Sequence, residues 1–271
     1  MLLNQPFDIA KVRLLILSLA LVSAAALASN VERRTGGATM LPGEAAIAGL
    51  FEAVAALLPA EPPISPVDLN DGRSTVGNRW RASFERFAHR DIEAAPAVGG
   101  VVFIGSSSIS SWDGIAQAFP EQNVIARGLG GAHMADCVRH LDRLALPYRP
   151  RTIVVYAGDN DLAEGVSPEA VLRAYADLVD QVRRALPETR VAFVSIKPSP
   201  TREALLPLIR RTNALIAAYT ATHARLDYVD VFTPMLAADG QTRPELFRPD
   251  GLHPNAAGYR VWSQAIATHL N

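Results

Sequence analysis

The sequence predicts an α/β fold: an open, doubly wound, five-stranded parallel sheet with helices on both faces. Short continuous apolar runs are typical of strands that are buried on both faces of such a sheet. They cover residues 101–104, 124–126, 152–156, 191–195 and 226–231. Helical patterns separate these runs, and this alternation favours a parallel sheet. Because five strands are too few for a closed eight-stranded barrel, we expect the sheet to be open.

Apolar residues at helical spacing predict the helices around these strands. They indicate helices over about 134–144, from Ser167 onwards, over about 203–222 and over 256–270. Ser167 suits a helix N-cap, and the proline that follows it suits a first turn. Trp80, Phe84 and Phe87 also repeat at helical spacing, which predicts a helix ahead of the first strand.

The first 28 residues have the features of an export signal. Lys11 and Arg13 precede a short apolar run, and a small-residue stretch ends at Ala28. An uncleaved membrane anchor is the alternative, although the apolar segment falls short of the roughly 20 residues of a spanning helix. We therefore expect an exported protein, periplasmic or secreted, or one that is anchored to a membrane through this segment.

Composition divides the rest of the chain and excludes some classes of protein. Residues 29–77 read as an N-terminal extension with a proline-rich linker, and residues 78–271 as the main domain. The formal net charge of −1 gives no sign of a nucleic-acid-binding face. A single cysteine, Cys137, excludes a disulfide framework within one chain, and its place on an apolar stripe predicts a core residue. Positive charge is carried almost wholly by arginine, and the only lysines are Lys11 and Lys197. We attribute this preference for arginine to codon bias.

Polar segments follow the predicted strands, and the last one precedes the final helix. The carboxyl ends of parallel strands meet at one edge of an open sheet, where ligands bind. These segments are residues 105–109, 127–131, 158–161, 197–200 and 249–254. Together they offer a serine cluster, glycine-rich turns, an asparagine and an Asp-x-x-His pair. Such groups can supply the nucleophile, base, base orienter and oxyanion donors of an acyl-transfer site.

Each of these segments also has a purely structural interpretation, as a helix cap or a surface turn. Phosphate binding is disfavoured, because Gly-x-Gly-x-x-Gly and the P-loop Gly-Lys pair are both absent. Asp250 and His253 could hold a metal, but no third ligand stands at a suitable spacing, so no metal site is expected. The order of the segments along the chain, each at the same end of a strand, is what favours catalysis.

These segments resemble the four blocks of the SGNH (GDSL-type) hydrolase superfamily, over about residues 80–271. The stretch Phe-Ile-Gly-Ser-Ser-Ser-Ile at 103–109 resembles the first block, in the subset of members with Gly-Ser-Ser-Ser. The usual first block reads Gly-Asp-Ser, and Ser106 stands here in place of the aspartate. Any of three adjacent serines could attack, and matching by register selects Ser107.

Gly131, Asn160 and the pair Asp250 and His253 match the other three blocks. The resemblance implies a flavodoxin-like sheet, a Ser107 nucleophile, a His253 general base and an Asp250 that orients it. It further implies an oxyanion hole made by the backbone N–H groups of Ser107 and Gly131 and the side-chain amide of Asn160. Neither a metal nor an organic cofactor is needed for this chemistry.

Five further residues are candidates for the substrate pocket: Ser108, Trp112, His133, Asp159 and Lys197. Trp112 could wall an acyl pocket or belong to the core. His133 could lie at the pocket rim or merely begin a helix. Lys197, Ser199 and Arg202 follow a strand, so they could line the cleft and meet a polar or anionic leaving group, or lie in a solvated loop.

The sequence thus predicts a serine hydrolase that cleaves carboxylic esters of small or short-chain acyl groups, acetyl groups on glycans among them. The same site could serve a lysophospholipase, a thioesterase or an acyltransferase. A catalytically silent binding protein on the same fold is the alternative outside enzymes. A lipase-like α/β-hydrolase is disfavoured because Gly-x-Ser-x-Gly is absent. The expected partner is a small-molecule, glycan or lipid ester and not a nucleic acid, with membrane contact only through the N-terminal segment.

Overall fold

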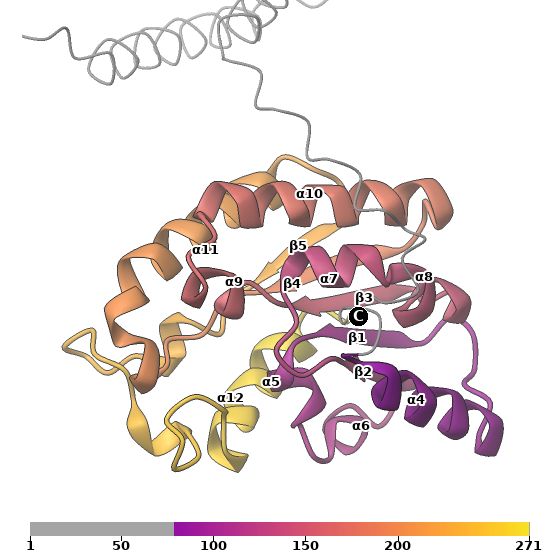
Figure 1. Ribbon diagram of the computed structural model, residues 1–271, viewed down its shortest axis with the longest axis horizontal. Coiled ribbons are helices and arrows are strands. Elements are labelled where there is room, and N and C mark those ends of the chain that lie inside the picture. The colour runs from indigo at the N-terminus through magenta and orange to yellow at the C-terminus, as the bar shows by residue number, and fades with distance from the viewer. Residues whose placement is uncertain (1–78, 271) are drawn as a thin grey trace, which may run out of the picture. The chain divides into compact units, whose positions relative to one another are not determined.

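The computed structural model describes residues 79–270. The predicted export signal (1–28) and the extension and linker (29–77) lie outside the described residues. In the described part, strands and helices alternate along the chain (Figure 1). The strands are β1 Val101–Gly105, β2 Val124–Gly128, β3 Thr152–Tyr156, β4 Arg190–Val194 and β5 Leu226–Val229. None of the helices in residues 79–270 has the length and apolar character to span a membrane.

The helices are of two kinds, short turns that follow strands and longer helices that cover the sheet. They are α4 Arg81–Glu93, α5 Ser107–Ser110, α6 Ile115–Ala118, α7 Met134–Arg139, α8 Leu141–Leu144, α9 Asp159–Ala163, α10 Pro168–Ala185, α11 Leu206–Ala221 and α12 Ala256–Ala267. Ser167 caps α10 as predicted, since its side chain accepts a hydrogen bond from the backbone N–H of Ala170. A 3-10 helix, Pro200–Leu205, leads into α11.

The five strands form one parallel sheet in the order β2-β1-β3-β4-β5. The predicted open, flavodoxin-like sheet is therefore confirmed. The chain passes from β1 to β2 at one side of β1, and β3 pairs at the other side. Ligands of open α/β sheets bind at such a topological switch point, beyond the carboxyl ends of the strands. The segments that follow β1 and β3 are thus brought together.

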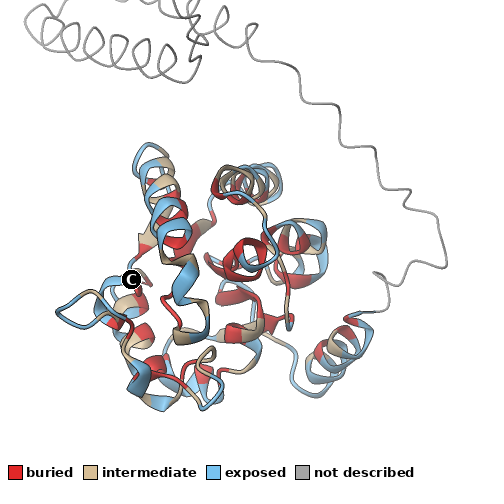
Figure 2. Cartoon of the chain, turned by 60° about the vertical axis from the view of Figure 1, so that its left-hand side comes forward, coloured by how far each residue is buried: buried red, intermediate tan, exposed pale blue. Residues whose placement is uncertain are grey.

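Alternate residues of each strand enter two separate cores, as strands covered on both faces require. Val102 and Ile104 of β1 pack with the buried stripes of α7, α10 and α11. Val101 and Phe103 pack with residues of α6 and α12 on the opposite face. Figure 2 shows the buried residues along one side of the longer helices and the exposed residues along the other.

The turn after β1 depends on glycine at one position. Gly105 has φ of +140°, and a Cβ there would lie 1.9 Å from the carbonyl oxygen of Tyr156. Because a backbone oxygen cannot yield by that much, a larger residue would separate β1 from β3. The backbone N–H of Ser106 then donates to that oxygen at 2.9 Å. This bond fixes the chain at the point where it turns into α5.

The helix predicted over residues 134–144 is wrong in one respect: the chain breaks at His140 into α7 and α8. The His140 ring packs edge-on against the rings of Trp80 and Phe84, with centroid distances of 5.8 and 5.2 Å. Its backbone leaves the helical region, with φ of −109° and ψ of 15°. This contact joins α4 to the main core.

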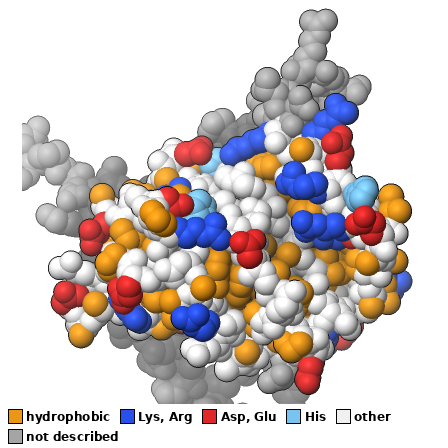
Figure 3. Space-filling model, turned by 90° about the horizontal axis from the view of Figure 1, so that it is seen from below, with side chains coloured by type: hydrophobic (Ala, Val, Ile, Leu, Met, Phe, Trp, Pro, Cys, Tyr) orange, Lys and Arg blue, Asp and Glu red, His pale blue; other side chains and the backbone are white. Residues whose placement is uncertain are grey.

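The surface of the described part carries both signs of charge. On the face seen in Figure 3, acidic and basic side chains are interspersed with apolar ones. This mixture accords with the net charge of −1.

Candidate active site

Ser107 is the first residue of α5, directly beyond the carboxyl end of β1. Its Oγ lies 2.9 Å from Nε2 of His253, 146 residues further along the chain. Ser106 and Ser108 are fully buried. Their hydroxyl oxygens have no hydrogen-bond partner among residues 79–270. Of the three adjacent serines, Ser107 is therefore the one within reach of the imidazole.

Asp250 and His253 lie in one tight loop before α12. Oδ2 of Asp250 lies 2.7 Å from Nδ1 of His253, and Oδ1 accepts the backbone N–H groups of Leu252 and His253 at 2.9 Å each. The hydrogen bond from the imidazole and these backbone bonds hold the pKa of Asp250 well below its usual range. An ionised carboxylate only accepts hydrogen bonds, so Nδ1 carries the proton. Nε2 is then free to accept the Ser107 hydroxyl proton.

Contacts with neighbouring segments hold this loop in place. The backbone N–H of Arg248 donates to the carbonyl of His253 at 2.8 Å. The carbonyl of Gly251 accepts the hydroxyl of Thr201 at 3.0 Å. The 3-10 helix after β4 therefore helps to fix where the imidazole lies.

Gly131 and Asn160, which follow β2 and β3, lie close to each other. Gly131 has φ of +71°, in the left-handed region that favours glycine. The next carbonyl, that of Ala132, accepts Nδ2 of Asn160 at 3.1 Å. Within residues 79–270, the backbone N–H groups of Ser107 and Gly131 make no hydrogen bond. These are the donors that the sequence predicts for an oxyanion hole.

Two of the predicted pocket residues, Trp112 and Ser108, are buried, and for Trp112 the structure agrees with the core interpretation. Trp112 is 6% exposed, and its ring stacks on that of Tyr259 at a centroid distance of 4.7 Å. It also meets Phe119 and Trp262 edge-on, as part of a buried aromatic cluster. Ser108 is buried, and its carbonyl accepts the Tyr259 hydroxyl at 2.9 Å.

Lys197 and Asp159 also lie away from solvent, so neither predicted setting of Lys197, open cleft or solvated loop, is correct. The Lys197 ammonium donates to Oδ2 of Asp159 at 2.9 Å and to the hydroxyl of Tyr156 at 3.0 Å. Nη1 of Arg202 lies 3.2 Å from the same carboxylate oxygen. A buried ammonium requires a counter-charge, and Asp159 supplies it.

His133 caps the start of α7, which agrees with its structural interpretation. Its backbone N–H donates to Asp136 at 2.9 Å, and its Nε2 lies 3.1 Å from the carboxylate of Glu164. Cys137, on the same helix, is fully buried, and burial raises the pKa of its thiol. The prediction that Cys137 is a core residue is confirmed.

Sequence reasoning assigned no role to Tyr156, and it placed Arg202 only as a residue that could line the cleft. Nη2 of Arg202 donates to Oδ1 of Asn160 at 2.9 Å. Tyr156, at the end of β3, is fully buried against Lys197. The available signal was that Tyr156 ends a strand leading to the predicted site, and that Arg202 lies in the segment that follows the next strand.

Asp159→Asn is expected to lower the free energy of unfolding by about 3–5 kcal/mol, because it leaves a buried ammonium without a counter-charge. Urea unfolding followed by circular dichroism measures the loss. Glu188→Gln is the control, because Glu188 pairs with Arg225 at the surface, where the two side chains are 81% and 50% exposed. That change should cost about 0–1 kcal/mol. Equal losses from the two substitutions would contradict a special role for the buried pair.

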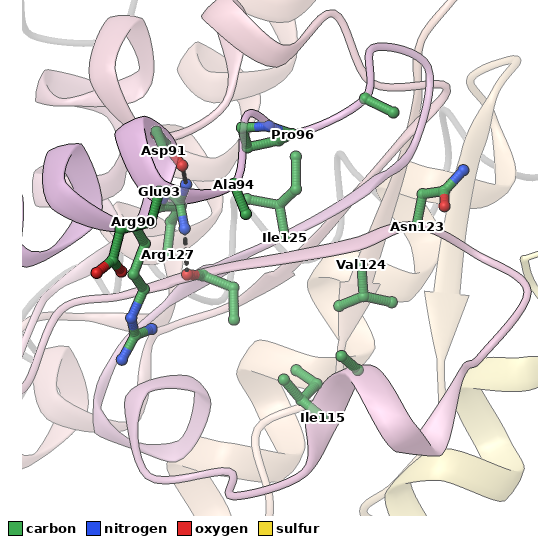
Figure 4. A pocket seen from close by; sticks show the side chains of 13 residues that line it. Arg90, Asp91, Glu93, Ala94, Pro96, Ile115, Asn123, Val124, Ile125 and Arg127 are labelled. Carbon is green, nitrogen blue, oxygen red and sulfur yellow. Dashed lines mark hydrogen bonds and ion pairs between the residues drawn. The ribbon is translucent and has the colours of Figure 1, made fainter.

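A hollow on another part of the surface lies away from these residues. It is lined by the C-terminal part of α4, by Ile115 and Ala116 of α6, and by residues 123–127 along β2 (Figure 4). Arg127 and Asp91 form an ion pair at its wall. None of the predicted site residues lines it.

The comparisons with known proteins agree with this geometry. The sequence pattern of the GDSL-like lipase/acylhydrolase family matches residues 97–261. No curated protein matches the chain. The fold is similar to that of a GDSL-like lipase from Bacteroides thetaiotaomicron, with a TM-score of 0.59 and 21% identity over 70% of this chain and 97% of that one.

Two solved esterases also have this fold. A carbohydrate esterase family 3 protein from Talaromyces cellulolyticus has a TM-score of 0.50 and 20% identity, over 64% of this chain and 96% of that one. An acetyl-xylooligosaccharide esterase from Geobacillus Stearmophilus, solved as a mutant, has a TM-score of 0.51 and 14% identity, over 65% and 96%. The family match covers more than half of the sequence. The chain therefore belongs to the GDSL-like lipase/acylhydrolase family and is an ester-bond hydrolase.

Proposed function

We propose that this hydrolase cleaves carboxylic esters through an acyl-enzyme formed on Ser107, with His253 as general base and Asp250 as the group that orients it. The observation that carries the proposal is the continuous hydrogen-bonded chain from Oγ of Ser107 through the imidazole to the carboxylate, at 2.9 and 2.7 Å. A hydroxyl is a weak nucleophile unless an adjacent base takes its proton. In this series of hydrogen bonds, His253 is that base, and it has the required tautomer.

In the first half of the reaction, Oγ of Ser107 bonds to the ester carbonyl carbon while its proton passes to Nε2 of His253. The tetrahedral intermediate then collapses, and the imidazolium returns that proton to the leaving alcohol. In the second half, a water molecule gives its proton to Nε2 and attacks the acyl group. Collapse of the second intermediate releases the acid and restores the Ser107 hydroxyl.

The developing oxyanion needs donors that are already in place. The backbone N–H groups of Ser107 and Gly131 and Nδ2 of Asn160 are proposed to supply them. The first two make no other hydrogen bond among the described residues, which favours this role. Each donor of this kind typically contributes about 3–4 kcal/mol to lowering the barrier.

We propose a short acyl group, such as acetyl, on a carbohydrate or other small alcohol as the substrate. The likeness of fold to the two esterases, one for carbohydrates and one for acetyl-xylooligosaccharides, supports the same substrate class.

A chain-length series tests the substrate class. The full chain is assayed with p-nitrophenyl esters from acetate to decanoate, with acetylated xylooligosaccharide and with a lysophospholipid, alongside Ser107→Ala. We expect kcat/KM to be highest for acetate, to fall beyond butyrate, and to be measurable on the oligosaccharide. Rates that rise towards decanoate, or a preference for the lysophospholipid, would replace this proposal by a lipase-like one.

A further inference from the structure

A cluster of buried charges lies directly behind Asn160. We call Tyr156, Asp159, Lys197 and Arg202 the Asp159 cluster. Tyr156, Asp159 and Lys197 are each at most 4% exposed, and the side chain of Arg202 is 16% exposed. The esterase mechanism proposed above uses none of these four side chains.

The cluster is held around one ionised carboxylate. Burial alone would raise the pKa of Asp159, but the charges of Lys197 and Arg202 lower it below its usual value. Burial is also the main cause that raises the pKa of Tyr156 well above its usual value, so its hydroxyl stays neutral. The carboxylate is therefore the fixed point on which the guanidinium is aligned.

Two bonds connect this cluster to Asn160. Oδ1 of Asp159 accepts the backbone N–H of Asn160 at 3.0 Å. Nη2 of Arg202 donates to the side-chain oxygen of Asn160 at 2.9 Å. The guanidinium thus holds Asp159 with one nitrogen and Asn160 with the other.

The partners of the Asn160 amide determine which way round it lies. A guanidinium has only donors, so the group facing Arg202 must be Oδ1. The carbonyl of Ala132 only accepts, so the group facing it must be Nδ2, at 3.1 Å. One N–H of Nδ2 is used in that bond. The other has no partner among residues 79–270 and remains available as a donor.

We propose that Arg202 is a positioning residue for catalysis, which holds the Asn160 amide with its N–H group towards the oxyanion. This inference rests on the proposed function of the site. Without the guanidinium, a rotated amide would present its oxygen to a negative charge. The guanidinium also draws electron density towards Oδ1, and such polarisation along a hydrogen-bonded chain strengthens the N–H donor. Because the oxyanion exists only after attack, the contribution falls on kcat and not on substrate binding.

Arg202→Met tests the proposal. We expect kcat for p-nitrophenyl acetate to fall by about 10- to 100-fold, somewhat less than the loss of a whole oxyanion donor, with KM changed by less than about twofold. The same substitution in an Asn160→Ala background should lower kcat by no more than about twofold further. Arg190→Met, which removes a guanidinium from an ion pair with Asp227 at the sheet edge, should leave kcat unchanged.

Thermal unfolding of every variant separates positioning from loss of fold. Arg202→Lys provides a second variant, because an ammonium keeps the charge beside Asp159 but lacks the planar fork with which the guanidinium reaches Asp159 and Asn160 from separate nitrogens. Its kcat should fall by about tenfold, and again only while Asn160 is present. The proposal is overturned if a folded Arg202 variant keeps wild-type kcat, or if the fold losses in kcat from the Arg202 and Asn160→Ala substitutions multiply in the double variant. It is also overturned if neither Arg202→Met nor Arg202→Lys folds. An active Ser107→Ala enzyme would instead overturn the proposed function.

Discussion

Ser107→Ala is expected to lower kcat/KM for p-nitrophenyl acetate by at least about 10⁴-fold, while the thermal midpoint stays within a few degrees of wild type. The loss is large because the residues of such a unit act together, and removal of the nucleophile alone leaves only the binding and oxyanion contributions. The fold should tolerate the change, because Ser107 is half-buried and its loss leaves Nε2 of His253 within reach of water. Steady-state kinetics and thermal unfolding on the same samples measure both quantities.

Ser106→Ala and Ser108→Ala are matched controls for this prediction. Both hydroxyls are buried without a hydrogen-bond partner in the described part of the chain, so their removal leaves no group unsatisfied. Both variants should keep kcat/KM within about threefold of wild type. The nucleophile would have to be reassigned if Ser107→Ala retained a tenth of the activity while Ser106→Ala or Ser108→Ala was folded but inactive.

Asp250→Asn is expected to lower kcat by about 10³- to 10⁴-fold, with little loss of stability. The two oxygens of Asp250 have different partners. Oδ1 holds the loop by accepting two backbone N–H groups, which an amide oxygen can also do. Oδ2 accepts the proton on Nδ1 of His253, whereas an amide NH₂ there would donate and so favour the unproductive tautomer. The kcat measured over the plateau of the pH profile reports this change.

Asp230→Asn is the control for the Asp250 substitution, because Asp230 is an exposed carboxylate that also accepts a backbone N–H, that of Thr233 at 3.0 Å. This variant should keep the wild-type kcat. A fully active Asp250→Asn enzyme would show that Asp250 serves only to shape the loop. Other contacts would then have to orient His253.

The strands could be predicted from the sequence because burial on both faces leaves continuous apolar runs. β3 begins and ends as expected, and the other strands differ by one or two residues at their ends. The break at His140 could not be predicted in this way. His140 packs there against Trp80 and Phe84, which come 60 and 56 residues earlier, and contacts so distant in the sequence leave no local pattern.

The residues that meet at the site were predictable from their place after successive strands, since parallel strands end at one edge. Which of the residues next to that edge are buried could not be predicted. Trp112 could equally have faced a pocket, and only its contacts with Tyr259 and Trp262 show that it belongs to the core. Whether a residue after a strand is covered depends on how the following helix packs, which local sequence does not specify.

The rarity of lysine in this sequence indicated that Lys197 has a specific role, and we interpreted it wrongly. Lys197 is the only lysine in residues 79–270, among many arginines, and codon bias does not account for the one exception. Its ammonium fits between Tyr156 and Asp159, where three donors on a compact group serve two acceptors. A rare residue type directly after a buried strand is therefore worth weighing as a buried partner.

Labelling with a fluorophosphonate, followed by peptide mapping, tests most directly whether Ser107 is the nucleophile. Such a probe bonds to a serine oxygen only where a base activates it. We predict one adduct per chain, on Oγ of Ser107, and none in the folded His253→Ala variant. An adduct on Ser106 or Ser108, or equal labelling of wild type and Ser107→Ala, would contradict the account.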